Sequence, residues 1–195
     1  MKKGFTLVEL IGVLVILAAL FLIITPIVDK EIKDGRQDLY NKQIKSIELS
    51  AQNWLSENVF AKPLEGETIT LTISQLKQDS FVDIDIKNPL TKKLFRNDML
   101  VKINNQAGII NYEVLVDSGK NEEIFENMPL ITLNGDVLTR LKLNETYKEL
   151  GAVCKTNNIL TDAVVSGTVD ITKIGINTIT YTCNSNKILR TVIVK

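Results

Sequence analysis

The sequence predicts an α+β fold in which a long N-terminal helix packs on a small antiparallel sheet and an all-β sandwich follows. Three observations favour this class. Apolar residues follow helical spacing over residues 5–58, short alternating runs follow in residues 59–117, and residues 129–195 are rich in Thr, Val, Ile and Asn. The polar stretch 118–128 separates the last two parts and is typical of a linker.

The composition argues against catalysis and against nucleic-acid binding. Apolar residues make up 45% of the 195, which is enough for a packed core, and 23 basic side chains balance 23 acidic ones. Nucleic-acid binding needs clustered Lys and Arg, which this balance does not indicate. Histidine, the commonest general base and metal ligand, does not occur in the sequence. We therefore expect no enzyme activity, no metal and no cofactor.

The N-terminus has the features of a membrane segment. Lys2, Lys3 and Gly4 precede an apolar run that extends from Phe5 to Val28. As a helix this run is about 36 Å long, which exceeds the roughly 30 Å of a hydrocarbon core. The two lysines place the N-terminus in the cytoplasm by the positive-inside rule.

Two ordinary explanations fit this segment poorly. A secretory signal peptide ends in small residues at a cleavage site, whereas Thr25 to Asp29 contains none of that pattern. A simple anchor leaves Glu9 unexplained, because a carboxylate within an apolar span costs about 3 kcal/mol on insertion scales. Glu9 therefore indicates a function.

The contiguous residues Lys2-Lys3-Gly4 and Phe5-Thr6-Leu7-Val8-Glu9 closely resemble the type III signal of type IV prepilins. The resemblance implies that a membrane prepilin peptidase cleaves between Gly4 and Phe5 and methylates the new amine of Phe5. It also implies that Glu9 pairs with this amine on a neighbouring subunit, since each charge would otherwise be stranded in an apolar medium. The implied partners are this peptidase, the pilus assembly platform and other pilin subunits.

The same resemblance implies the location of the protein. Before assembly it would be a single-pass protein of the cell membrane, and afterwards part of an extracellular filament. Gly12 and Pro26 then have two interpretations, because both residues are tolerated in membrane helices as kinks or close-approach points. Pilins often carry a proline at the position of Pro26 and a loosened helix before it, so local loosening and a simple kink both remain open.

Beyond Pro26 the helix is expected to become amphipathic and to continue to about residue 58. Apolar residues recur there at spacings of three and four: Tyr40, Ile44, Ile47, Ala51, Trp54 and Leu55 or Asn58. This stripe must pack against something, and the alternating run 68–73 predicts a half-buried strand. Ser74 is a candidate N-cap for a short helix through Lys77.

The rest of the small sheet is predicted from a hairpin. Residues 100–103 and 109–114 are apolar runs, and residues 104–108 form a five-residue loop between them. Residues 72–112 are similar to the globular part of some Gram-positive pilin-like proteins. Asp83 and Asp85 alternate with apolar residues, which favours a solvated face over a metal site.

Residues 129–195 resemble small immunoglobulin-like modules of bacterial surface proteins. The matching segments are Pro129–Gly135, Tyr147 with Leu150–Ala152, Val165–Asp170 and Gly175–Tyr181. An acidic turn often seen in these modules is replaced by Asn157-Asn158, so we predict no calcium site.

Cys154 and Cys183 are expected to face the interior of this module. Ala152 and Cys154 alternate onto one face of their strand, and Tyr181 and Cys183 onto one face of theirs. A disulfide would stabilise so small a domain by about 3 kcal/mol. Two buried free thiols are the alternative.

The sequence as a whole predicts a structural subunit, a minor pilin, of a type IV pilus-like surface filament. The immunoglobulin-like module would serve adhesion or another interaction with an extracellular surface ligand. The alternative is a pseudopilin of a DNA-uptake (competence) or type II secretion-like apparatus. The sequence contains no basic strip with flanking aromatic residues, which DNA capture would require.

Overall fold

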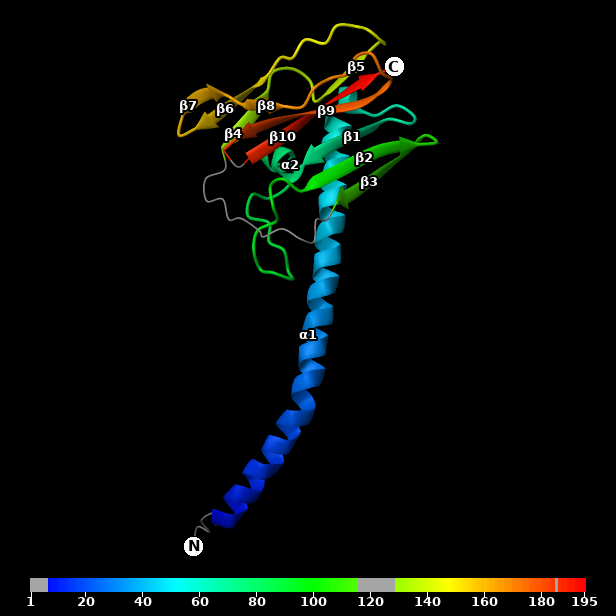
Figure 1. Cartoon of the computed structure of the whole chain (residues 1–195). Coiled ribbons are helices and arrows are strands. Elements are labelled where there is room, and N and C mark those ends of the chain that lie inside the picture. The colour runs from blue at the N-terminus through cyan, green and yellow to red at the C-terminus, as the bar shows by residue number, and fades with distance from the viewer. Residues whose placement is uncertain (1–6, 116–128, 185) are drawn as a thin grey trace.

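A computed structural model describes residues 7–115, 129–184 and 186–195. One long helix carries a small sheet and a β-sandwich at its C-terminal end, and its other end extends far from both (Figure 1). The fold is α+β, which confirms the predicted class. The predicted linker 118–128 lies outside the described residues.

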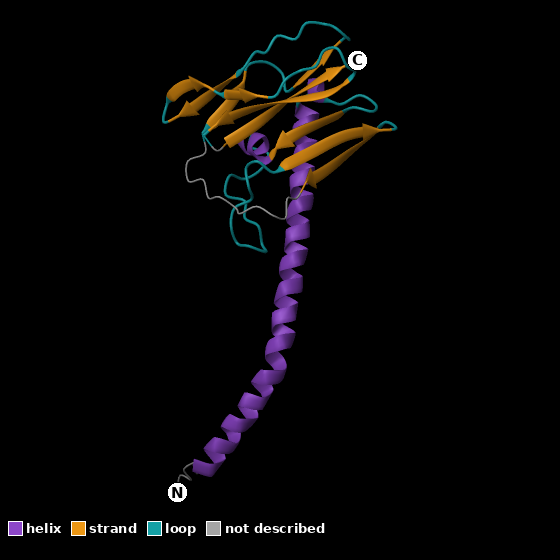
Figure 2. Ribbon diagram, in the orientation of Figure 1, coloured by secondary structure: helices purple, strands orange, loops and turns teal. Residues whose placement is uncertain are grey.

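Helix α1 (Leu7–Glu57) is uninterrupted for 51 residues, or about 77 Å. The helix curves in its N-terminal half and is nearly straight in its C-terminal half (Figure 2). Pro26 lies inside it and supplies no backbone N–H to the ladder. The Thr25 hydroxyl donates to the Phe21 carbonyl at 2.7 Å, so a side chain engages the backbone in this turn.

The C-terminal part of α1 packs on a three-stranded antiparallel sheet. Its strands are β1 (Thr68–Thr72), β2 (Leu100–Gln106) and β3 (Ile109–Leu115), in the order β1-β2-β3. A short 3₁₀ helix, η1 (Val59–Ala61), follows α1. The buried core contains the predicted stripe and one face of the sheet: Ile47, Ala51, Trp54, Leu55, Ile69, Leu71, Val101, Ile103 and Val114. We call residues 7–115 the helix–sheet unit.

The predicted five-residue hairpin loop is wrong. Strands β2 and β3 stay paired up to Gln106 and Ile109, so only Ala107 and Gly108 form the turn. Both have positive φ, +52° and +80°, as a type I′ turn requires. Asn105 belongs to the strand because its side chain is buried and its Nδ2 donates to the Pro63 carbonyl at 2.9 Å.

The predicted N-cap is also wrong by two residues. Helix α2 spans Ile73–Gln78, and Thr72 caps it in a capping box with Gln75. Strand β1 therefore ends at Thr72, before Ile73, and Ser74 is fully buried within the helix. Asp83 and Asp85 are exposed as predicted, although their segment is a series of turns and bends with no strand.

Residues from 129 onward form a sandwich of two sheets. One sheet has the order β4-β6-β7, with strands Leu130–Leu133, Ala152–Thr156 and Ile159–Asp162. The other has the order β5-β10-β9-β8, with strands Leu138–Leu141, Asn186–Val194, Gly175–Cys183 and Val164–Ser166. Strand β5 runs parallel to β10, and the other pairs are antiparallel. The predicted sandwich is confirmed.

Candidate assembly helix and domain junction

The N-terminal half of α1 is an exposed apolar surface. No residue from 7 to 28 is buried, and the large apolar side chains keep between 45% and 80% of their surface. By length and composition this helix could cross a membrane. Glu9 lies in its first turn, among apolar neighbours. Lys2, Lys3, Gly4 and Phe5 lie outside the described residues.

The helix continues through the two positions predicted to loosen it. Gly12 is exposed, and a side chain placed there would meet no other atom within 4 Å. A neighbouring helix could therefore approach the backbone closely at this position. Loosening at Gly12 and Pro26 concerns the assembled filament and stays a prediction.

The structure contains the predicted disulfide. Cys154 on β6 and Cys183 on β9 are bonded, with their Cα atoms 5.8 Å apart. Both side chains are buried, so the bond joins the two sheets through the sandwich core. Within the described residues no cluster of His, Cys, Asp and Glu has the composition of a metal site.

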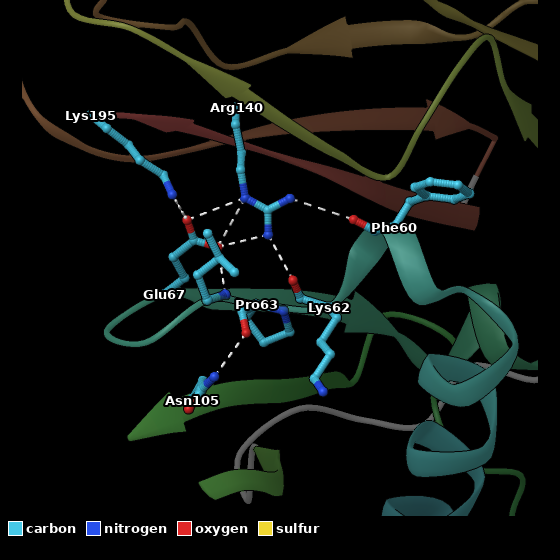
Figure 3. Close-up of polar contacts among 8 residues, drawn as sticks. Phe60, Lys62, Pro63, Glu67, Asn105, Arg140 and Lys195 are labelled. Atoms are coloured by element: carbon cyan, nitrogen blue, oxygen red, sulfur yellow. Dashed lines mark hydrogen bonds and ion pairs between the residues drawn. The ribbon is translucent and has the colours of Figure 1, made fainter. Parts of the chain in front are cut away.

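A buried carboxylate joins the sandwich to the helix–sheet unit (Figure 3). Glu67 is only 6% exposed, and its oxygens lie 2.8 Å from Arg140 Nη2 and 2.5 Å from Lys195 Nζ. The Leu64 N–H donates to the same carboxylate at 2.8 Å. Burial alone would raise the pKa of Glu67, but hydrogen bonds from Arg140 and Lys195 outweigh it and lower the pKa to about 2. Glu67 is therefore ionised at neutral pH.

A second polar contact ties α2 to strand β10. The side-chain amide of Gln75 donates from Nε2 to the Leu189 carbonyl at 2.9 Å, and its Oε1 accepts from the Leu189 N–H at 3.2 Å. One side chain thus bonds a strand residue twice, as a neighbouring strand would. Thr72 Oγ1 adds a bond to the Lys187 carbonyl at 2.9 Å. These groups are largely shielded from water, so losing a partner is costly.

Two parts of this chain match known protein families. Residues 1–25 match the model of the prokaryotic N-terminal methylation motif, and residues 131–194 match that of the bacterial surface protein Ig-like domain. The chain joins a type IV pilin signal to a surface Ig-like domain. Neither family is an enzyme family. The pilin signal implies processing by a prepilin peptidase and assembly with other pilins, and with the apolar helix it fits membrane anchoring before assembly.

Whole-chain comparisons add little to these two matches. No curated protein matches the chain. Among solved structures, the lipoprotein BT2262 from Bacteroides thetaiotaomicron is 22% identical with a TM-score of 0.30. That match covers 34% of this chain, and the chain spans only 37% of the lipoprotein.

Strand β10 gives the Ig-like domain two packed faces. Ile188 and Val192 of β10 lie in the core between its two sheets. Ile193 of β10, with Leu138 of the adjacent strand β5, belongs to the core of the helix–sheet unit. A strand buried on both faces has a nearly continuous apolar sequence. Residues 188–194 show this pattern, which is the one sequence signal that could have revealed the junction.

Arg190 interrupts that apolar run and is itself buried. Only 1% of its side chain is exposed, and Nη1 donates to Glu149 at 2.9 Å and to the Tyr181 hydroxyl at 2.7 Å. Nη2 donates to the Asn134 carbonyl and Nε to the Asp136 carbonyl, at 2.8 and 3.0 Å. Burial raises the pKa of Tyr181, which stays a neutral hydrogen-bond donor. This network fixes two loops at one end of the Ig-like domain.

Proposed function

We propose that this protein is a minor pilin, a structural subunit of a type IV pilus-like filament on the cell surface. One observation carries the proposal: the N-terminal half of α1 is apolar and exposed on all sides, and the part of the chain at the other end of this helix includes a domain of the bacterial surface Ig-like family. Such a helix needs lipid or other apolar helices around it. A membrane provides the first environment, and a filament core of identical or related helices provides the second.

Maturation would switch the helix from the first environment to the second. Before cleavage the nitrogen of Phe5 is a neutral amide, and after cleavage between Gly4 and Phe5 it is an amine that is charged near neutral pH. Glu9 would then pair with the methylated amine of the neighbouring copy. Because either charge alone is costly in an apolar medium, this pairing sets the axial position of each subunit.

The Ig-like domain would lie outside the helical core and serve adhesion. Its bulk at the end of α1 favours a minor subunit, because each copy must fit outside the packed helices. The junction at Glu67 and Gln75 supports a fixed orientation of this domain on α1. The surface offered to a ligand is then the part of the domain that faces away from the helix–sheet unit.

Mass spectrometry of the mature protein from its native host tests the proposal. We expect the loss of Met1–Gly4 and one added methyl group on Phe5. Glu9→Ala should leave cleavage intact but remove the protein from filaments, whereas Glu48→Ala, a carboxylate change outside the apolar segment, should not. Retention of Met1–Gly4 would contradict the proposal.

Immunogold labelling with an antibody to residues 129–195 tests the role. Label on filaments supports a pilin, and label confined to the membrane contradicts it. Salt-sensitive binding of DNA by the purified protein would favour the DNA-uptake alternative.

A further inference from the structure

A lysine side chain is buried between α2 and the segment that precedes β2. Lys77 lies in the last turn of α2 and is only 3% exposed. Its Nζ donates to Asn97 Oδ1 at 2.9 Å and to the Phe95 carbonyl at 3.4 Å. Lysine is rarely buried in this way, because its amine is strongly hydrated and costly to remove from water. A buried lysine in contact with an amide is therefore a candidate for chemistry at its amine.

The backbone holds the side chains of Lys77 and Asn97 against each other. The Ser74 N–H donates to the Asn97 carbonyl at 2.9 Å. One residue earlier on the helix, the Ile73 N–H donates to the Met99 carbonyl at 2.8 Å. These bonds fix the segment before β2 on the first turn of α2, one turn before Lys77. Asn97 is itself only 7% exposed, so both side chains are held in place and shielded from water.

The surroundings favour the neutral form of the lysine amine. Burial lowers the pKa of Lys77 to about 8, and the nearby charge of Asp85 opposes this shift. A neutral lysine amine is a nucleophile, as in the lysines that form Schiff bases. Because a carbonyl bond is about 1.2 Å long, the Asn97 Cγ lies no more than about 4.1 Å from Nζ. Such proximity replaces a bimolecular encounter with a unimolecular step.

We propose that Lys77 and Asn97 join in an intramolecular amide bond, a covalent cross-link between α2 and the segment before β2. The neutral amine of Lys77 attacks the Asn97 Cγ, so that a bond forms between Nζ and Cγ and the bond between Cγ and Nδ2 breaks. One proton moves from Nζ to Nδ2, which leaves as ammonia. Nothing is oxidised or reduced in this step, so it needs no further reactant.

Asp85 is placed to carry that proton. The Phe95 N–H donates to the Ile86 carbonyl at 3.0 Å, which brings the residue after Asp85 alongside Phe95. The Phe95 carbonyl in turn contacts the Lys77 amine, and the charge of Asp85 acts on that amine. A carboxylate near a reacting amine can accept its proton and return it to the leaving group. Asp85 therefore relays the proton in this reaction.

The cross-link reinforces the part of the helix–sheet unit that holds the Ig-like domain. Gln75, two residues before Lys77, bonds strand β10 at Leu189. An amide between Lys77 and Asn97 closes a covalent ring and keeps α2 from separating from the segment before β2. A ring of this kind restricts the unfolded chain much as a disulfide does. This inference is independent of the proposed pilin function, because it concerns only groups within one chain.

Peptide mass spectrometry of the full chain, expressed alone in a heterologous host, tests the bond. Trypsin cleaves after Lys and Arg unless proline follows, and it does not cleave after an acylated lysine. A digest should therefore contain residues 46–87 joined to residues 97–102. The joined species should be lighter than the sum of the two peptides by one ammonia molecule. Two separate peptides, one ending at Lys77 and the other beginning at Asn97, would overturn the proposal.

Two substitutions of lysine provide the controls. Lys77→Arg keeps the positive charge, but a guanidinium stays protonated and is not a nucleophile near neutral pH, so the joined peptide should be absent. Lys87→Arg, an exposed change that keeps the trypsin site, should leave the joined peptide present. The same joined species in Lys77→Arg would contradict a bond at Lys77. The wild-type digest decides the proposal even where Lys77→Arg fails to fold.

The role of Asp85 is tested by the rate at which the cross-link forms. In cell-free synthesis of the full chain in detergent, samples taken over time give the joined fraction. Asp85→Asn should slow the appearance of the joined peptide about a hundredfold. Asp83→Asn, at an exposed carboxylate two residues away, should follow the wild-type time course. Equal rates for Asp85→Asn and the wild type would show that Asp85 does not relay the proton.

Discussion

Arg140 Nη2 lies 2.8 Å from Glu67 Oε2, and this ion pair joins the Ig-like domain to the helix–sheet unit (Figure 3). Lys195 contacts the other oxygen of the same carboxylate at 2.5 Å. Two cations from the Ig-like domain thus meet one buried anion from the loop before β1. Substitutions at this ion pair therefore measure how strongly the Ig-like domain and the helix–sheet unit stabilise each other.

Glu67→Gln should destabilise residues 29–195, the chain without its apolar segment, by about 2 kcal/mol. The substitution leaves Arg140 and Lys195 with a neutral partner, and their partial exposure limits the loss. Urea unfolding followed by circular dichroism measures the effect. Glu65→Gln is the matched control, because Glu65 is an exposed carboxylate in the same loop and should change the free energy of unfolding by less than about 0.5 kcal/mol.

The same carboxylate predicts a pH dependence of stability. The pKa of Glu67 is about 2 in the folded protein and 4.5 ordinarily, so its contribution is present above pH 4.5 and is lost as the pH falls toward 2. Between pH 5 and pH 2 the wild type should therefore lose up to about 3 kcal/mol more than Glu67→Gln. Parallel stability curves for the two proteins over this range would show that Glu67 does not carry the effect.

Gln75→Ala should cost about 2–3 kcal/mol, because it leaves the N–H and the carbonyl of Leu189 buried without their partners. Gln37→Ala, on the exposed part of α1, is the control. Chemical denaturation of both variants measures the difference. Equal stabilities would mean that water replaces the lost bonds at this junction.

Trp54 is the single tryptophan and lies in the core of the helix–sheet unit, where its Nε1 donates to Asp79 at 2.7 Å. Its fluorescence therefore reports on a part of the molecule that lacks the disulfide. Cys154→Ser with Cys183→Ser should lower the free energy of unfolding of the Ig-like domain by about 3 kcal/mol. Because the two parts share a core, the fluorescence transition should shift by the same amount.

An unchanged fluorescence transition in the double serine variant would mean that the two parts unfold independently. Reduction of the wild type under denaturing conditions, followed by refolding without oxidant, is the matched test that alters no residue. The reduced protein should show the same shift in the unfolding of the Ig-like domain and in the Trp54 fluorescence transition.

Local patterns predicted the elements of the fold well. The stripe that contains Ile47 and Trp54 has helical spacing, and the alternation around Cys154 and Cys183 directs both side chains inward, which favoured the disulfide over two free thiols. The wrong prediction of the hairpin loop has a physical cause. Asn105 is a residue type that favours turns, but its buried bond to Pro63 holds it in a strand.

The junction could not be predicted in the same way. Gln75 and Leu189 are 114 residues apart, and Glu67 and Arg140 are 73 apart. Neither spacing leaves a periodic trace in a single sequence. Arg190 was missed because an arginine in a strand ordinarily faces solvent, whereas four oxygen acceptors hold this one inside.

Strand β10 belongs to two cores at once, and this has a mechanical consequence. A force applied to the outer edge of the Ig-like domain is transmitted to α1 through packed side chains. A domain joined only by a flexible linker would instead reorient under the same force. Fluorescence anisotropy of a dye on the Ig-like domain distinguishes the two cases, since a rigidly packed domain rotates only with the whole particle.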